Sequence, residues 1–547
     1  MKKIQFVIIA TYEDLFKKPS APALEKIKKY PLQVVMAELV GVNYMLRPAT
    51  KLSIKSNLFS QLRMIAFWIG YGKYLSNLYT AIRDTKAFQL GNDVIIFNRA
   101  GCLYGIDYSI RNLKSNDEEF KYTDEFWTDL IDFCLACNTV VTKHEIVPED
   151  YKVSLMEHIN AQQALLNELK IVSNPILTLN RCIELFRWFE RDNIYHKEFS
   201  AYLESLELDS EKFLEILLLL YLNPKAKSRI PFWINLDEKN SPEASALLKW
   251  LSDAKLLEKK HDLDFLMLYK WPVYKYKAEN YFMLDPELMI DKMYRQLIND
   301  FYWDHLRAKG ISYQNYRSFI GKFFEKYVAG HFKDYMSSNK PATFKHTYQL
   351  LFGHSERELC DIYIRHKRNV MVGQVKSTAF SDDQKFKTSY EFYKGDTKKF
   401  YDDAGVNQII QSIVWLEQHG GKIDSPFYRN TKLFPVLILN DKFFEIPMMT
   451  QILNEEFRKQ LQSIKSNFVV KDLVVMSVSS VERLHAKNIN NRKDLWKLLW
   501  STQLHSGILP HFNNTLDRFN VQFNPKRELK KVKTFLHLKK NNLSSVS

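Results

Sequence analysis

The spacing of apolar side chains predicts that the first part of the chain is mostly helical. In the segments 151–170 and 210–222, apolar residues recur every three or four positions, as they do on one face of a helix. Short β-like runs interrupt this pattern at 92–110 and 263–284, and the first apolar run, near residue 7, predicts a strand. We therefore expect an α-rich α+β region over about residues 20–300.

The pattern changes after about residue 306. Amphipathic helices are expected at 316–332 and 404–420. Apolar runs predict strands at 343–352, 356–366, 369–378, 433–440 and 472–478. The predicted fold class is therefore α+β and multidomain, with an α-rich N-terminal region followed by a domain of the order α-β-β-β-α-β.

Chain length and these changes of pattern predict several domains, because one hydrophobic core rarely serves 547 residues. The expected divisions are an α-rich α+β region at 1–145, a helical region at 146–235, a module at 236–305, the α-β-β-β-α-β domain at 306–485, and a C-terminal helix with a basic tail at 486–547. Within 236–305, a helix, two aromatic β-like runs and a second helix are compatible with a winged-helix module that docks on DNA. A plain α+β packing unit fits the same order.

Charge and cysteine usage narrow the expected partners and location. The chain has 78 Lys and Arg against 63 Asp and Glu, a formal net charge of +15, which favours a nucleic-acid partner, although a solvated basic surface gives the same count. Five cysteines without disulfide spacing, and no apolar run of membrane-spanning length, favour a cytoplasmic protein without membrane contact. The pair Cys134 and Cys137 lacks further ligands at zinc spacing, so buried thiols are favoured over a metal site. The chain contains no GxxxxGK[ST] motif, which argues against an intrinsic ATPase.

Three polar side chains stand out in the segment CDIYIRHKRNVMVGQVKSTAF, residues 360–380. If residues 367 and 368 form a two-residue turn, counting outward along the hairpin places Asp361 opposite Gln374, and opposed residues project from the same face. Lys376 lies two positions further and shares that face. An acid, an amide and an ammonium group are therefore expected to converge. The other face is apolar at Ile362, Ile364, Met371 and Val375.

The predicted helix before the hairpin adds a second carboxylate, Glu325. Gly321 precedes it by four residues and Ala329 follows by four, so Glu325 lies on a stripe of small side chains. Small neighbours allow a strand to approach closely, so Glu325 is expected to reach the same site as Asp361.

These residues and the order of elements around them resemble the PD-(D/E)XK nuclease superfamily, over about residues 310–445. The restriction-endonuclease-like core of that family has the order α-β-β-β-α-β. Its second strand carries a metal-binding Asp, its third strand an acidic-x-Lys signature, and its first helix often a Glu. The resemblance implies that Asp361 is the metal-binding Asp, that Gln374-Val375-Lys376 is the signature, and that Glu325 is the helix acid.

Two positions depart from the family pattern, since Cys360 stands at the place of the Pro and Gln374 replaces the second acid. Mrr-type restriction enzymes are similar in using Gln-x-Lys. A glutamine carbonyl is still a hard oxygen ligand for Mg²⁺, but it brings no negative charge. The resemblance thus implies a catalytic set of Asp361, Gln374, Lys376 and Glu325, with Mg²⁺ or Mn²⁺ held by Asp361, Glu325 and Gln374.

The activity implied is metal-dependent cleavage of phosphodiester bonds, chiefly in DNA, in a setting such as prokaryotic restriction or antiphage defence. The alternative is a catalytically inactive nuclease-like protein that binds nucleic acid or serves as a regulatory subunit of a larger complex. In either case the N-terminal helical region is a candidate interface for a protein partner.

Further nucleic-acid contacts are expected beyond the hairpin. The segment 381–403 interleaves Lys with Tyr and Phe, a mixture that suits backbone contacts and base stacking, although a solvated loop has the same composition. The second helix offers glutamines to the metal site or to a phosphate. The candidate nucleic-acid-binding residues are Lys385, Lys387, Lys394, Lys398, Gln408 and Gln411.

Overall fold

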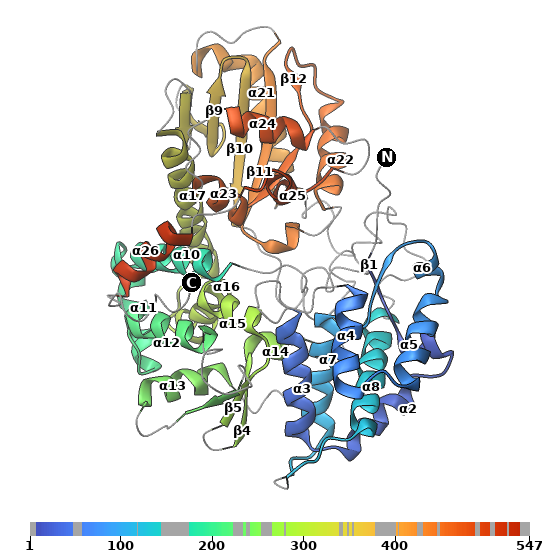
Figure 1. Cartoon of the computed structure of the whole chain (residues 1–547). Helices are drawn as coiled ribbons and strands as arrows, with labels where there is room; N and C mark the ends of the chain where they lie inside the picture. The colour runs from blue at the N-terminus through green and yellow to red at the C-terminus, as the bar shows by residue number, and fades with distance from the viewer. Residues whose placement is uncertain are drawn as a thin grey trace. The chain divides into compact units, whose positions relative to one another are not determined.

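A computed structural model of the chain shows a mixed α+β architecture with several sheets (Figure 1). It describes residues 7–46, 57–116, 119–143, 174–222, 233–236, 241–252, 265–277, 280–337, 343–346, 349–352, 355–377, 401–402, 404–423, 430–445, 449–486, 493–503, 509–521 and 525–536. The chain forms two compact units. The first contains the described parts of Met1–Glu145 and Ser200–Leu297, and the second contains those of Ile146–Phe199, Ile298–Lys385 and Ser389–Ser547.

The N-terminal part of the first unit is built from helices around a short parallel strand pair. The strands are β1 (Val7–Ile9) and β2 (Asp93–Ile95), and the first was expected from the sequence. The helices are α1 (Tyr12–Phe16), α2 (Ala21–Lys26), η1 (Ile27–Lys29), α3 (Leu32–Met45), α4 (Leu58–Ile69), α5 (Lys73–Arg83), α6 (Lys86–Gln89), α7 (Arg99–Asn112) and α8 (Asp124–Lys143).

The expectation of a β-like run at 92–110 is correct only for β2. Asn98 caps a helix by accepting a hydrogen bond from the backbone N–H of Gly101 (2.9 Å), and α7 follows. Nearly every side chain of α7 is buried, including the polar Asp107 and Ser109, so the helix lacks the exposed polar face that identifies a helix from sequence.

The second part of the first unit contains a three-stranded antiparallel sheet in the order β3-β5-β4. Its elements are α12 (Ser210–Leu222), β3 (Trp233–Asn235), α13 (Pro242–Leu251), α14 (Leu266–Lys270), β4 (Val273–Lys277), β5 (Asn280–Met283) and α15 (Pro286–Met293). The start of the β-like run at 263–284 is helix α14, whose side chains are largely buried. The helix, hairpin and helix expected in 236–305 are present, and DNA contact by this module stays a prediction.

The second unit contains the central sheet, in the order β12-β11-β10-β9-β6, with β13 also pairing with β11. Its strands are β6 (Thr343–His346), β9 (Ile362–His366), β10 (Asn369–Lys376), β11 (Lys432–Leu439), β12 (Val469–Val470) and β13 (Val474–Ser477). The pairs β10–β9 and β9–β6 are antiparallel, whereas β10 and β11 are parallel and are joined through α21 (Val406–Ile423). With α17 (Tyr313–Ser337) in front, these elements follow one another as α17-β6-β9-β10-α21-β11.

Two of the predicted strands are each divided in the structure. The run 343–352 forms β6 and β7 (Gln349–Phe352), and the run 356–366 contributes to β8 (Ser355–Glu358) and β9. Strands β7 and β8 pair with each other in a separate two-stranded sheet. The sequence of β8, Ser-Glu-Arg-Glu, has no apolar side chain to offer a core face, which is consistent with its place outside the central sheet.

Helices cover both faces of the central sheet, whereas the sequence pattern suggested a single apolar face on the hairpin. On the face of Asp361, the core contains Tyr363 and Val372 of the hairpin together with Ile409 and Ile413 of α21. The opposite face buries Ile362, Ile364, Met371 and Phe434. On that face, Phe434 packs against rings of α24 (Lys493–Thr502). A sheet buried on both faces carries apolar residues on both, so alternation alone does not identify its solvent face.

The remaining helices of the second unit lie before the strands of the central sheet, between β11 and β12, or after β13 in the sequence. They are α10 (Pro175–Glu190), α11 (Asn193–Ser205), α16 (Arg295–Asp300), the π-helix η4 (Phe301–Leu306), η5 (Lys442–Glu445), α22 (Met449–Leu461), α23 (Val478–Ala486), α25 (Phe512–Arg518) and α26 (Pro525–Phe535). Helices α11 and α16 each cross a boundary between the two units. The boundary inside α11, between Phe199 and Ser200, falls within the predicted 146–235 region. The residues before it belong to the second unit because α10 packs against α26 and α17.

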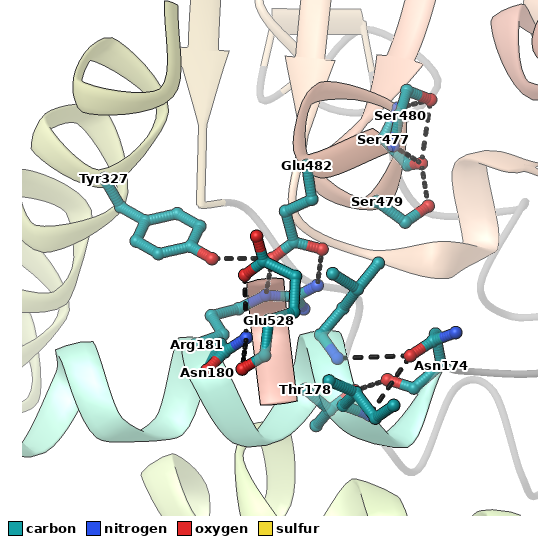
Figure 2. Close-up of polar contacts among 12 residues, drawn as sticks. Asn174, Thr178, Asn180, Arg181, Tyr327, Ser477, Ser479, Ser480, Glu482 and Glu528 are labelled. Carbon is teal, nitrogen blue, oxygen red and sulfur yellow. Dashed lines mark hydrogen bonds and ion pairs between the residues drawn. The ribbon is translucent and has the colours of Figure 1, made fainter. Parts of the chain in front are cut away.

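An ion pair and a hydrogen bond join three helices of the second unit, α10, α17 and α23. Arg181 of α10 donates to both carboxylate oxygens of Glu482 on α23 (3.0 and 2.9 Å), and Tyr327 of α17 donates to Glu482 Oε1 (2.8 Å). Figure 2 shows Arg181 and Tyr327 reaching Glu482 from two different helices. The side chain of Glu482 is 1% exposed and that of Arg181 is 11% exposed. This contact fixes α17 against α10 and α23 two residues from Glu325.

The turn of the β9–β10 hairpin is the predicted one. His366 pairs with Asn369, residues 367 and 368 form the turn, and the pairing continues to Ile362 opposite Gly373. Lys367 has a φ of 57°, a left-handed conformation that L-residues other than glycine adopt at a cost.

Substitution of Lys367 by glycine is expected to raise the free energy of unfolding by about 0.5–1 kcal/mol, because relief of the left-handed conformation exceeds the added entropy of the unfolded chain. Urea denaturation measures the change. The matched control is Arg368→Gly, since Arg368 has no positive φ and its replacement is expected to destabilise by about 0.5–1 kcal/mol. Equal effects of the two substitutions would contradict the conformational argument.

Among the residues described, none of the helices combines the length and the apolar character needed to cross a bilayer.

Candidate active site

The four residues of the predicted catalytic set line one cavity in the second unit. Its volume is about 200 Å³. Glu325 comes from α17, Asp361 from the residue before β9, and Gln374 and Lys376 from β10. The full lining is Glu325, Leu359, Asp361, Gln374, Lys376, Gln408, Gln411, Ser412 and Trp415. The same-face prediction for Asp361, Gln374 and Lys376 therefore agrees with their positions.

Asp361 is held by the backbone of the neighbouring strand. Its own N–H donates to the carbonyl of Gly373 (3.1 Å), and its Oδ2 accepts from the N–H of Val375 (2.7 Å). The strand pairing ends at Ile362 opposite Gly373, so the predicted pairing of Asp361 with Gln374 is not part of the ladder. These two bonds hold Asp361 beside β10 instead. The residue is 5% exposed, so its carboxylate is fixed and largely shielded from bulk water.

Two glycines, Gly373 and Gly405, allow close contacts on the two faces of β10. A Cβ on Gly373 would lie 3.1 Å from Ile362 Cβ across the hairpin, on the face opposite Asp361. Gly405, before α21, has a φ of +92°, and a Cβ there would lie 3.2 Å from Lys376 Cε. The aliphatic part of Lys376 therefore runs against Gly405, which sequence reasoning did not identify.

Glu325 is half-buried on α17, which crosses the end of β10. A Cβ on Gly321 would lie 3.5 Å from Ser377 Oγ, and Arg317 Nη2 donates to the carbonyl of Ser377 (3.0 Å). The small residue one turn before Glu325 thus lets the strand end approach the helix, as the sequence predicted. This contact brings Glu325 to the cavity.

Gln374 is 6% exposed and uses its amide nitrogen for hydrogen bonds inside the protein. Nε2 lies 3.5 Å from the carbonyl oxygen of Leu359 and 3.3 Å from Ser412 Oγ. Neither Leu359 nor Ser412 was among the predicted site residues.

Helix α21 presents a row of side chains to the cavity. Gln408 and Gln411 line it and are exposed, as expected of residues available to a metal ion or phosphate. Ser412 and Trp415 complete the row, and the spacing of the four residues is that of one helix face. Since the helix was predicted, this periodicity could have added Ser412 and Trp415 to the candidate list.

The four lysines predicted to contact nucleic acid cannot be placed at the site. Lys385, Lys387, Lys394 and Lys398 lie outside the described residues, and their role stays a prediction.

The donor set of the cavity is that of a hard cation. It offers two carboxylates and three glutamine amides, and Lys376 adds one positive charge. Mg²⁺ is commonly bound by one or two carboxylates plus substrate phosphates, and it favours oxygen over sulfur or imidazole. Within the part of the chain that the structure describes, there is no group of three or more His, Cys, Asp and Glu that could hold a metal. The cavity has two such side chains, so a cation there would depend on an amide oxygen and on further ligands.

The cysteines do not provide an alternative centre. All five are free and buried, and burial raises the pKa of Cys134 to about 12. A buried thiol with a raised pKa is a poor nucleophile and a poor metal ligand.

Comparison with known proteins identified no relative: no family model, no curated protein and no solved structure matches the chain.

Proposed function

We propose that the chain is a metal-dependent nuclease that hydrolyses phosphodiester bonds, with DNA as its expected substrate. The observation that carries the proposal is the single cavity lined by Glu325, Asp361, Gln374 and Lys376. The order of elements that supplies these residues resembles the restriction-endonuclease-like core, and the residues fall at the positions of its Gln-x-Lys variant. By the same resemblance, restriction or antiphage defence is the proposed setting.

Each residue has a role that follows from its chemistry. Asp361 and Glu325 would hold Mg²⁺ or Mn²⁺ with the amide oxygen of Gln374 as a neutral ligand. When bound, such an ion would polarise a phosphoryl oxygen and lower the pKa of a water that it holds. Lys376 would offset the charge that develops on the phosphate, from a position fixed by Gly405.

The charge balance predicts how ion and substrate depend on each other. Two carboxylates and one ammonium give the cavity a formal charge of about −1, which is low for tight binding of a free divalent ion. A DNA phosphate adds a further anionic ligand. The ion and the nucleic acid should therefore bind together more strongly than either binds alone.

A cleavage assay tests the proposal. Plasmid, linear duplex, single-stranded DNA and RNA are incubated with the protein and Mg²⁺ or Mn²⁺, with and without a chelator. We expect cleavage of at least one DNA substrate that stops when the chelator is added. Salt-sensitive binding without cleavage, unaffected by chelator, would contradict the proposal and favour the inactive nucleic-acid-binding protein. Absence of any nucleic-acid affinity, together with a co-purified partner, would favour a regulatory subunit.

A further inference from the structure

The amide of Gln374 has a defined orientation in the cavity wall. Its hydrogen bonds within the described residues both use Nε2, towards the Leu359 carbonyl at 3.5 Å and Ser412 Oγ at 3.3 Å. Leu359 O can only accept a hydrogen bond. The amide nitrogen is therefore turned to the protein, and the carbonyl oxygen Oε1 is the end that remains for a ligand.

Ser412 completes this arrangement from α21. Its hydroxyl lies within hydrogen-bonding distance of the carbonyl oxygens of Leu359 and of Gln408 (2.8 Å for Gln408). Since a hydroxyl carries one proton, it donates to one carbonyl at a time and its lone pair is left to accept from Gln374 Nε2. Ser412 is 2% exposed, so water does not readily replace these bonds.

The opposite orientation of the amide is disfavoured by the same neighbours. It would place Oε1 about where Nε2 now lies, so that two acceptor oxygens would face each other at the Leu359 carbonyl. The single proton of Ser412 could satisfy only one of them. Such a buried unpaired acceptor is costly.

We propose that Ser412, together with the Leu359 carbonyl, is a positioning residue that turns the carbonyl oxygen of Gln374 towards a cation in the cavity. This inference rests on the proposed function, because it requires an ion at this site. It assigns a reason for glutamine at the position of the second acid, since the amide nitrogen can donate to the Leu359 carbonyl, which would repel a carboxylate.

The test is ion binding, measured independently of cleavage. Tb³⁺ is titrated into the full-length protein and its luminescence is excited through tryptophan, because Trp415 lines the same cavity. Ser412→Ala is expected to weaken Tb³⁺ affinity about fivefold, an effect comparable to the loss of one hydrogen bond. In the Gln374→Glu background, the same substitution is expected to change affinity by less than about twofold, because a carboxylate presents an oxygen in either orientation.

Two controls separate the possible failures. Ser412→Cys has a similar volume and a weaker hydrogen-bonding group, so it keeps the test valid if the alanine variant unfolds, and it is expected to lose about twofold to threefold. Equal losses from Ser412→Ala in both backgrounds, or no loss in either, would overturn the positioning role while leaving the ion site intact. A Tb³⁺ signal that is the same in wild type and in Asp361→Asn would instead remove the ion site and the proposed function with it.

Discussion

Replacement of Lys376 by methionine is expected to lower the rate of metal-dependent DNA cleavage by about a hundredfold to a thousandfold, as the loss of one preorganised charge-stabilising group does in other enzymes. Methionine keeps much of the aliphatic length that packs against Gly405, so the substitution removes the ammonium group with little change in packing. Single-turnover cleavage of the substrate identified in the panel measures the effect. Binding of the DNA should fall far less, because one cation among many contributes little to affinity.

Arg368→Met is the matched control for this prediction. Arg368 is exposed at the opposite end of the same hairpin, so its replacement removes one positive charge from the unit without altering the cavity. We expect a change in rate of less than about twofold, since an exposed charge far from the reacting atoms is screened by solvent. Equal losses from the two substitutions would show that Lys376 acts through net charge alone, and an unchanged rate in Lys376→Met would remove its catalytic role.

Replacement of Glu482 by glutamine is expected to lower the free energy of unfolding by about 3–5 kcal/mol, because it removes the buried negative charge that faces the largely buried guanidinium of Arg181. The glutamine keeps the shape of the side chain, so the effect reports charge rather than volume. Urea denaturation followed by tryptophan fluorescence measures the loss. Because Tyr327 of α17 also bonds to Glu482, we further expect weaker placement of Glu325 and slower cleavage in the fraction that stays folded.

Glu184→Gln provides the comparison on the same helix. Glu184 forms an ion pair with Arg187 one turn away on α10, and both side chains are more than 40% exposed (42% and 43%). An exposed pair of this kind contributes about 0.3–0.5 kcal/mol, so its loss should be close to the error of the measurement. A destabilisation by Glu482→Gln as small as that of Glu184→Gln would contradict the structural role of the buried pair.

The hairpin and its polar face could be predicted because they depend on local rules. A turn at residues 367 and 368 fixes every opposed pair, and a period of two then assigns Asp361, Gln374 and Lys376 to one side. Glu325 was identifiable for a similar reason, since the small residues at 321 and 329 mark the helix stripe that a strand can approach. These inferences use neighbours within one helix or one hairpin.

The contacts that could not be predicted join distant parts of the chain. Arg181 and Glu482 are separated by 301 positions, and no pattern along the sequence pairs them. Ser412 looks like an ordinary polar residue of a helix until α21 is laid against Leu359 and Gln374. The helical period of α7 was hidden for a different reason, because a helix that is buried on nearly all sides has no contrast between a core face and a solvent face.

The most direct measurement is a crystal structure of the Lys376→Met variant with a short DNA duplex and Mn²⁺, located by its anomalous scattering. The slow variant should retain uncut DNA. We predict one Mn²⁺ peak in the cavity, between a DNA phosphate and the carboxylates of Asp361 and Glu325, with Oε1 of Gln374 among its ligands. DNA and Mn²⁺ bound away from this cavity, or an empty cavity beside bound DNA, would contradict the account.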